Sequence, residues 1–178
     1  GGWCRQTLVG GSYGLLSAGP TFAPNPDYFA ALLWRAALSG RALAVSKTSL
    51  PSVRVYAFCS EGTSGGVALL ALNLDPARAV TLATQPSLLT ELEREEWVVT
   101  GADAASPATS REVLINGAAP VRAEFSLPPP KAVPAKTPLV LEPFSYTVAR
   151  VKTANIQACM KSSDQGVQSH PRARIIKR

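Results

Sequence analysis

The sequence lacks most of the residues from which metal and nucleophilic sites are built. Its 178 residues include one histidine, His170, and three cysteines, Cys4, Cys59 and Cys159. No pair of cysteines has the CxxC spacing, so a zinc site is not expected and we predict no metal ligand. A catalytic cysteine needs a histidine partner, and His170 near the end of the chain is a poor one. The odd number of cysteines leaves at least one unpaired within the chain.

Long hydrophobic runs are also absent. No apolar stretch approaches the roughly 20 residues of a membrane-spanning helix, so we predict no transmembrane segment. The chain begins with Gly1 rather than Met, and it does not open with the basic and then apolar regions of a signal peptide. We therefore expect the N-terminus to be a processed end or a truncation.

The excess of positive charge is concentrated near the end of the chain. The net charge is +6, but positions 160–178 hold five of the 18 Lys and Arg residues and one of the 12 acids. No aromatic side chain lies among these charges to stack on a base. We interpret 160–178 as a basic disordered tail and predict no nucleic-acid partner. Contact of 172–178 with nucleic acid or a membrane is the least favoured alternative.

One segment has the pattern of an amphipathic helix. Asn25 is suited to the cap position, Pro26 to the first helical position and Asp27 to the first turn, which predicts a helix over 27–39. Gly40 is expected to end it. Apolar side chains form one stripe along this helix, namely Phe29, Leu32, Leu33, Ala36 and Ala37.

The remainder of the chain has a β pattern. Short apolar or alternating segments recur between turn residues, which is typical of a β-sandwich or barrel. They are 41–47, 53–59, 66–74, 78–84, 95–100, 112–115, 121–126, 138–141 and 145–151. Asn116-Gly117 predicts a hairpin turn. The range 128–138 holds five prolines, so we predict a loop across the outside of the sandwich rather than a central strand.

The first 40 residues predict a strand over 3–9, a glycine-rich loop over 10–14 and the helix. A lone βα unit cannot bury its own faces, so we interpret it as the last unit of a larger α/β barrel whose other strands are missing. The predicted fold class is therefore mainly β, with a C-terminal β-sandwich after this unit. The predicted domains are 1–40 for the barrel unit, 41–159 for the sandwich and 160–178 for the tail.

Several segments together resemble the C-terminal portion of glycoside hydrolase family 79, which contains heparanases and β-glucuronidases. They are Cys4–Leu16, Pro24–Phe29, Ala31–Trp34, Val55–Cys59, Leu72–Leu74, Arg94–Trp97, Val113–Gly117, Pro143–Tyr146 and Ile156–Cys159. They occur in family order, and the Arg-Gln-Thr-Leu and Arg-Glu-Glu-Trp pieces are most similar to the plant heparanase-like branch. The resemblance implies the same fold, a (β/α)8 barrel followed by a β-sandwich.

The resemblance implies a retaining glycosidase, which needs two carboxylates flanking the scissile bond. The family places this pair on earlier barrel strands, so we predict no catalytic residue in this chain and no cofactor. The acids present do not replace the pair. Asp27 belongs to the helix start and Asp75 to a turn. A cluster of four acids on or beside a predicted strand is interpreted as a solvated face, namely Glu91, Glu93, Glu95 and Glu96.

The resemblance also implies a substrate-binding position. In the family a glycine N–H and a tyrosine hydroxyl hold the glucuronate carboxylate, and these positions correspond to Gly11 and Tyr13. Ser12 stands between them, where the family commonly has Asn. A backbone contact would survive that change. The alternative is a tight turn with Tyr13 as a packing residue. Cys59 and Cys159 match the family's disulfide, and two buried thiols are the alternative in a reducing compartment.

The function implied is that of a C-terminal fragment of a heparanase-like retaining β-glucuronidase, inactive without the missing N-terminal barrel portion. Its expected partners are that portion and a glucuronate-containing carbohydrate. The expected location, also from the family, is extracellular or in the lysosome or vacuole, peripheral to a membrane at most. The alternative function is a non-catalytic β-sandwich module that binds acidic glycans or a partner enzyme.

Overall fold

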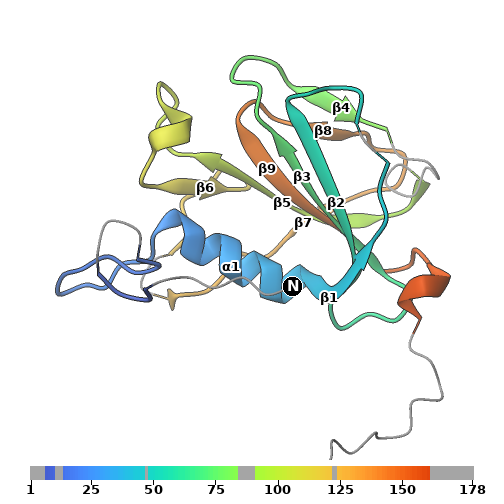
Figure 1. The fold of residues 1–178 in the computed structure, drawn as a ribbon, viewed down its shortest axis with the longest axis horizontal. Helices are drawn as coiled ribbons and strands as arrows, with labels where there is room; N and C mark the ends of the chain where they lie inside the picture. The colour runs from blue at the N-terminus through green and yellow to red at the C-terminus, as the bar shows by residue number, and fades with distance from the viewer. Residues whose placement is uncertain (1–6, 11–13, 47, 84–90, 122–123, 161–178) are drawn as a thin grey trace, which may run out of the picture.

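The computed structural model describes residues 7–10, 14–46, 48–83, 91–121 and 124–160. Within these ranges the named elements are one α-helix, nine strands and two short 3-10 helices (Figure 1). The elements are α1 (Pro26–Ala37), β1 (Leu38–Leu43), β2 (Val53–Ser60), β3 (Val67–Asn73), β4 (Val80–Leu82), β5 (Arg94–Gly101), η1 (Pro107–Thr109), β6 (Val113–Ile115), β7 (Lys131–Val133), β8 (Leu139–Leu141), β9 (Ser145–Val151) and η3 (Gln157–Cys159). The mainly β fold class is confirmed for these residues.

Seven strands form one antiparallel sheet in the order β1-β2-β3-β9-β5-β6, with β7 also paired to β5. Strand β9 fills the centre because it pairs with β3 on one side and with β5 on the other. The outer edge of β5 is shared, since β7 pairs with Arg94–Glu96 and β6 pairs with Val99–Gly101. Strands β4 and β8 form a separate two-stranded sheet.

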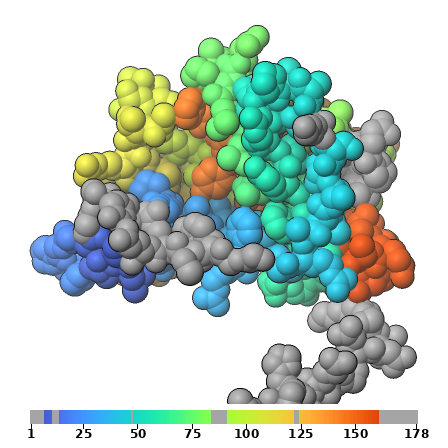
Figure 2. Space-filling view, in the orientation of Figure 1, coloured from blue at the N-terminus to red at the C-terminus, as the bar shows by residue number. Residues whose placement is uncertain are grey.

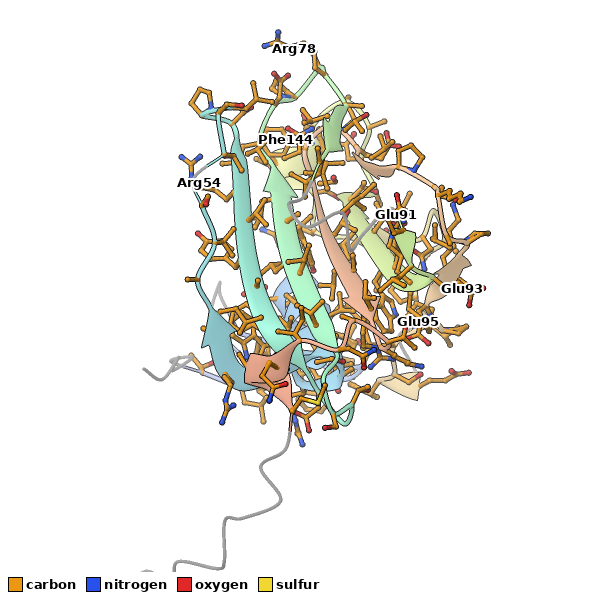
Figure 3. The ribbon with its side chains drawn as sticks, turned by 90° about the vertical axis from the view of Figure 1, so that its right-hand side faces the viewer. Arg54, Arg78, Glu91, Glu93, Glu95 and Phe144 are labelled. Carbon is orange, nitrogen blue, oxygen red and sulfur yellow. A yellow bond between two sulfur atoms is a disulfide. The ribbon has the colours of Figure 1, made fainter. Side chains whose placement is uncertain are left out.

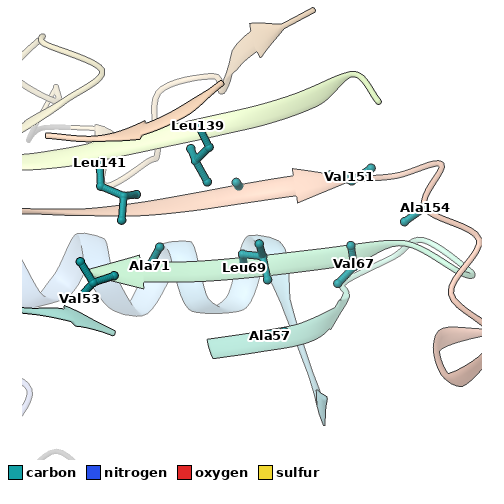
Figure 4. Close-up of a cluster of buried hydrophobic side chains, with 10 residues drawn as sticks. Val53, Ala57, Val67, Leu69, Ala71, Leu139, Leu141, Val151 and Ala154 are labelled. Carbon is teal, nitrogen blue, oxygen red and sulfur yellow. The ribbon is translucent and has the colours of Figure 1, made fainter. Parts of the chain in front are cut away.

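The large sheet carries an apolar cluster on each face, because alternate residues of a strand point to opposite sides. The first is covered by α1 and contains Phe29, Leu33, Ala37, Leu38, Ala68, Trp97, Val99, Ile115 and Val148. The second includes residues of β8 and contains Val53, Ala57, Val67, Leu69, Ala71, Leu139, Leu141, Ala149, Val151 and Ala154 (Figure 4). The sheet is therefore the middle of three layers.

Helix α1 matches the predicted start, with Pro26 in the first turn and Asp27 beside it. Its buried residues, Phe29, Leu33 and Ala37, are spaced by four, so they form one stripe against the sheet. The predicted end was wrong. The helix stops at Ala37 and the chain passes directly into β1, so Gly40 lies within a strand. Leu38 is buried in the same cluster as Ala37, which keeps the chain on the sheet.

Two other local predictions can be compared with the structure. Asn116 and Gly117 both have positive φ, +53° and +79°, and form the predicted tight turn. The proline-rich range 128–138 is not entirely a loop, because β7 lies between its prolines. This strand is three residues long and pairs with β5 at one end of that strand, a position that tolerates neighbouring prolines.

The preceding barrel unit remains a prediction. Within the described residues, the expected first strand is represented by a single bridge between Val9 and Leu16. The three-domain division at residues 40 and 159 is also untested. Of the described helices, none is long and apolar enough to cross a membrane.

Candidate functional site

The segment before α1 folds back on itself and brings three short stretches together. Leu16 N donates to Leu8 O at 2.8 Å, and Ser17 N donates to Ala23 O at 2.9 Å. Leu16 bridges Val9 on one side and Pro24 on the other. The residues on either side of the loop at 10–14 are therefore joined by backbone hydrogen bonds.

The two ends of this loop are in close contact. A Cβ atom on Gly14 would lie 2.6 Å from Gly10 O and 2.8 Å from Leu16 O, both backbone atoms, so only glycine fits there. Gly10 has a φ of +83°, which also favours glycine. The Thr7 hydroxyl donates to Gly10 O at 3.0 Å. Backbone packing thus fixes the distance between the loop's ends.

Asn25 joins the loop to α1. Its side-chain Nδ2 donates to Gly14 O at 2.7 Å and its backbone N donates to Leu15 O at 2.9 Å. The residue occupies the cap position with extended backbone, yet its side chain makes no capping hydrogen bond. The expectation of a capping side chain is therefore wrong, since the amide bonds a carbonyl eleven residues earlier.

The acidic cluster proved to be divided between surface and interior. Glu91 and Glu93 are both exposed, and Figure 3 shows Glu93 at one edge of the molecule. Glu96, by contrast, is 7% exposed and accepts a 2.6 Å bond from Arg94 Nε. The interpretation of all four acids as one solvated face was wrong, because strand alternation sends Glu95 and Glu96 to opposite faces.

Glu95 is held by two cations. Arg150 Nε donates to its Oε2 at 2.7 Å and Lys152 Nζ donates to its Oε1 at 2.6 Å. Burial opposes ionisation, but the hydrogen bonds from Lys152 and Arg150 outweigh it and lower the pKa of Glu95. A carboxyl group with a lowered pKa is a poor general acid, so we interpret this network as structural.

The same network lines an open depression of about 410 Å³ beside β5, β7 and β9. Its lining includes Glu95, Arg150, Lys152, Val133 and Pro134. The carboxylate of Glu95 is bonded to both cations in this lining, so these three side chains neutralise one another in part. Three His, Cys, Asp or Glu side chains do not gather as a metal site within the described part of the chain.

Comparison with known proteins then identifies the family. No family model matches the chain. Over 137 residues it is 36% identical to Baicalin-beta-D-glucuronidase of Scutellaria baicalensis, an alignment that covers 77% of this chain and 24% of that protein. It is also 47% identical over 93 residues to Heparanase-like protein 1 of Arabidopsis thaliana, covering 52% and 17% respectively. This chain belongs to the heparanase-like proteins of glycoside hydrolase family 79.

The heparanase-like chain spans a quarter or less of these two relatives, a share consistent with a C-terminal portion. Among solved structures, the GH51 arabinofuranosidase from Xanthomonas axonopodis pv. citri has a TM-score of 0.48 and 17% identity. That match covers 81% of this chain and 30% of the arabinofuranosidase.

The predicted binding residues Gly11, Ser12 and Tyr13 lie outside the described residues of the heparanase-like chain, as does Cys4. Their assignment therefore stays a prediction, although the loop's two ends are described. Cys59 and Cys159, the pair that the resemblance implies, form a disulfide with a Cα–Cα distance of 5.2 Å. It joins the end of β2 to η3, beyond the last strand.

Sequence reasoning missed two features of this region. It assigned no long-range role to Asn25, because capping rules consider only neighbours along the helix. It also missed the partners of Glu95 and Glu96, although the order Arg94-Glu95-Glu96-Trp97 in a strand was a usable signal. Adjacent acids in a strand face opposite sides, so they cannot share one solvated face, and each needs a partner of its own when the sheet is covered on both faces.

Proposed function

We propose that this chain is the C-terminal part of a heparanase-like retaining β-glucuronidase that hydrolyses glucuronate-containing glycans or glycosides. The observation that carries the proposal is the 36% identity to a protein named as a β-D-glucuronidase, over 77% of this chain. The sheet and its two apolar clusters would form the sandwich, and residues 7–37 would belong to the barrel.

In this proposal the loop at 10–14 recognises the sugar carboxylate. The Gly11 N–H and the Tyr13 hydroxyl would donate to it, with Ser12 between them. Active sites of (β/α)8 enzymes are built from loops that follow strands, as this one would follow the strand at 3–9. Uncharged donors hold a carboxylate through the direction of their hydrogen bonds rather than through charge. A neutral glycoside has no carboxylate to accept these bonds, so the loop would favour glucuronides.

The acid/base and nucleophile carboxylates would come from barrel strands of the longer protein, about 5–5.5 Å apart as in other retaining enzymes. The 178-residue chain alone is then inactive, and it requires no cofactor. The Cys59–Cys159 disulfide favours an oxidising location such as the cell exterior or the vacuole.

The test compares the longest natural polypeptide that contains this chain with the 178 residues alone. Both are assayed on 4-nitrophenyl β-D-glucuronide and on the corresponding glucoside. We expect turnover of the glucuronide by the long polypeptide only, and a rise in KM of about 10-fold in its Tyr13→Phe variant, since one hydrogen bond to a charged group is lost. A long polypeptide that hydrolyses neither compound, or prefers the glucoside, would overturn the proposal.

A further inference from the structure

We propose that an apolar strip on the sheet beside α1 is the docking surface for a second helix, one that belongs to the polypeptide preceding residue 1 in the longer protein. The strip lies on β2, on β3 and against one side of α1, and is called the β2–β3 strip: Trp34, Tyr56, Phe58, Leu70 and Leu72. The proposal rests on the proposed function in one respect, that this chain is part of a longer polypeptide. It is independent of what that polypeptide hydrolyses.

The β2–β3 strip is continuous across two paired strands and one helix. Tyr56 of β2 lies opposite Leu70 of β3, and Leu72 follows on the same face, two residues along β3. Phe58 shares this face because it is two residues from Tyr56. Its ring meets the Trp34 ring edge-on, at a centroid distance of 5.1 Å. The five side chains therefore form one surface, on the face of the sheet against which α1 packs.

The β2–β3 strip is far from buried. Trp34 is 48% exposed and Tyr56 is 49% exposed. Phe58, Leu70 and Leu72 are half-buried. Large apolar groups that lie together at a surface mark a contact with another part of a protein, whereas scattered ones need no explanation. Tryptophan and tyrosine are also the side chains that most often dominate such contacts.

Helix α1 covers only part of the sheet face on which the strip lies. Its buried cluster includes Val148 of β9, Trp97 of β5 and Ala68 of β3, and no described residue of β2 is a buried member. The strand order is β2-β3-β9, so β2 lies two strand spacings, about 9.5 Å, from β9. Neighbouring helices pack about 8–10 Å apart. A helix placed beside α1 would therefore lie over β2 and β3.

The side of α1 next to the strip permits this packing. Trp34 marks that side through its ring contact with Phe58. Ala30 and Ala31 precede Trp34 by four and three residues, so they lie on the same side of the helix. Both are half-buried and small, which lets a second helix approach closely. The expected occupant is accordingly an amphipathic helix whose apolar face covers β2, β3 and this side of α1.

The occupant is sought outside the 178 residues because the described chain leaves the strip open. The alignment with Baicalin-beta-D-glucuronidase covers 77% of this chain but only 24% of that protein, so most of the relative's length has no counterpart here. In a longer protein of which this chain is the C-terminal portion, the remaining polypeptide precedes residue 1. It leads, through α1, to the face that α1 covers only in part.

Hydroxyl-radical footprinting read by mass spectrometry tests whether the strip is covered. The longest natural polypeptide that contains this chain is compared with the 178 residues alone. In the long polypeptide we expect oxidation of Trp34 and Tyr56 to fall about 5-fold, since the core of a docked surface is packed like a protein interior. Val140 is the matched control, because it is 41% exposed and belongs to β8, which covers the opposite face of the sheet. Its oxidation should be the same in both polypeptides.

Two footprinting results would overturn the docking surface. Equal oxidation of Trp34 and Tyr56 in the two polypeptides would show that nothing covers the strip. Protection in the 178-residue chain that increases with its concentration would assign the strip to a second copy of this chain instead.

Photo-cross-linking tests whether the occupant is a helix. Tyr56→p-benzoylphenylalanine and Leu72→p-benzoylphenylalanine place a probe at two points of the strip, in separate variants of the long polypeptide. These points are offset by two residues along paired strands, about 6.6 Å, which is close to one helical turn of about 5.4 Å. The two probes should therefore react at positions about four residues apart, both before residue 1. Val140→p-benzoylphenylalanine is the control and should give neither product.

The cross-links also decide between occupants. Products within residues 1–178, or positions that alternate every second residue as in a strand, would overturn the helix from the preceding polypeptide. Neither measurement depends on glucuronidase activity. An inactive long polypeptide would overturn the proposed function, while the footprint and the cross-links would still decide the docking surface.

Discussion

On each face of the large sheet, one arginine joins the covering layer to a central strand, but the two arginines differ in how far they are buried. On the α1 face, Arg150 pairs with Glu95 and donates to Ala36 O. On the β8 face, Arg94 pairs with Glu96 and donates to Thr137 O and Pro138 O, directly before β8. Each arginine therefore ties a covering layer to β5 or β9. The side chain of Arg94, on the β8 face, is 1% exposed, whereas that of Arg150, on the α1 face, is 15% exposed.

Burial decides what each pair contributes. Removing one partner of a buried pair leaves an uncompensated charge, whereas a solvated pair is screened and contributes little. Adjacent residues of one strand should accordingly give very different results when they are neutralised.

The largest effect is expected for Glu96→Gln. The uncharged amide removes the carboxylate that accepts from the buried Arg94 Nε at 2.6 Å, which should lower the free energy of unfolding by about 3–5 kcal/mol. Urea unfolding followed by tryptophan fluorescence measures it. The double variant Arg94→Met/Glu96→Leu should recover most of the loss. A smaller loss of unfolding free energy in Glu96→Gln than in Glu95→Gln would contradict the difference between the two faces.

Each face of the sheet also carries one buried hydroxyl, from adjacent residues of β9. Thr147 Oγ1 and Tyr146 Oη are buried, and neither has a hydrogen-bond partner among the residues that the structure describes. Thr147→Val removes the desolvation cost and should stabilise the protein by about 1 kcal/mol. Tyr146→Phe should gain less, because the residue is only partly buried. Thermal unfolding of both variants checks the order, and destabilisation by Thr147→Val would indicate a hidden partner.

A smaller loss, about 0.5 kcal/mol, is expected for Glu95→Gln because its pair is partly solvated. Raising the salt concentration from 0.05 M to 0.5 M should reduce this loss but leave that of Glu96→Gln nearly unchanged. Glu93→Gln is the matched control, because Glu93 is an exposed acid directly before β5. Equal salt sensitivity of Glu95→Gln and Glu96→Gln would show that the two faces do not differ.

The pH dependence of the Glu95 pair gives the smallest signal. The pKa of Glu95 is lowered from its ordinary 4.5, so its contribution is present above that value and is lost as the pH falls through the folded-state pKa. The stability difference between wild type and Glu95→Gln should therefore shrink between about pH 6 and pH 3. A difference that grows on acidification would mean that the pKa is raised instead.

Local patterns predicted much of the fold. The Asn25-Pro26-Asp27 start and the four-residue spacing of Phe29 and Leu33 were sufficient for α1. Alternating segments were sufficient for most strands. The end of α1 was missed because Leu38 leaves the helix to stay in the apolar cluster, a tertiary contact that outweighs the local signal of Gly40.

The candidate site could be predicted only in outline. Glycines at 10 and 14 indicated a tight loop, and the structure adds that their backbones touch. The partner of Asn25 depends on how the chain folds back between residues 14 and 25, which no periodicity encodes. The partners of Glu95 and Glu96 depend on the pairing of β5 with β9 and on the position of β8, which only the three-dimensional arrangement fixes.

The Cys59–Cys159 bond links two residues that are 100 positions apart in the sequence, one at the end of β2 and one in η3. The exposed turn around η1 lies within that span and stands out at the opposite side of the molecule from η3 (Figure 2). A protease that cut this turn would therefore leave both pieces covalently joined. On a denaturing gel the nicked protein would migrate as one chain until a reductant was added, so cleavage would pass unnoticed under oxidising conditions.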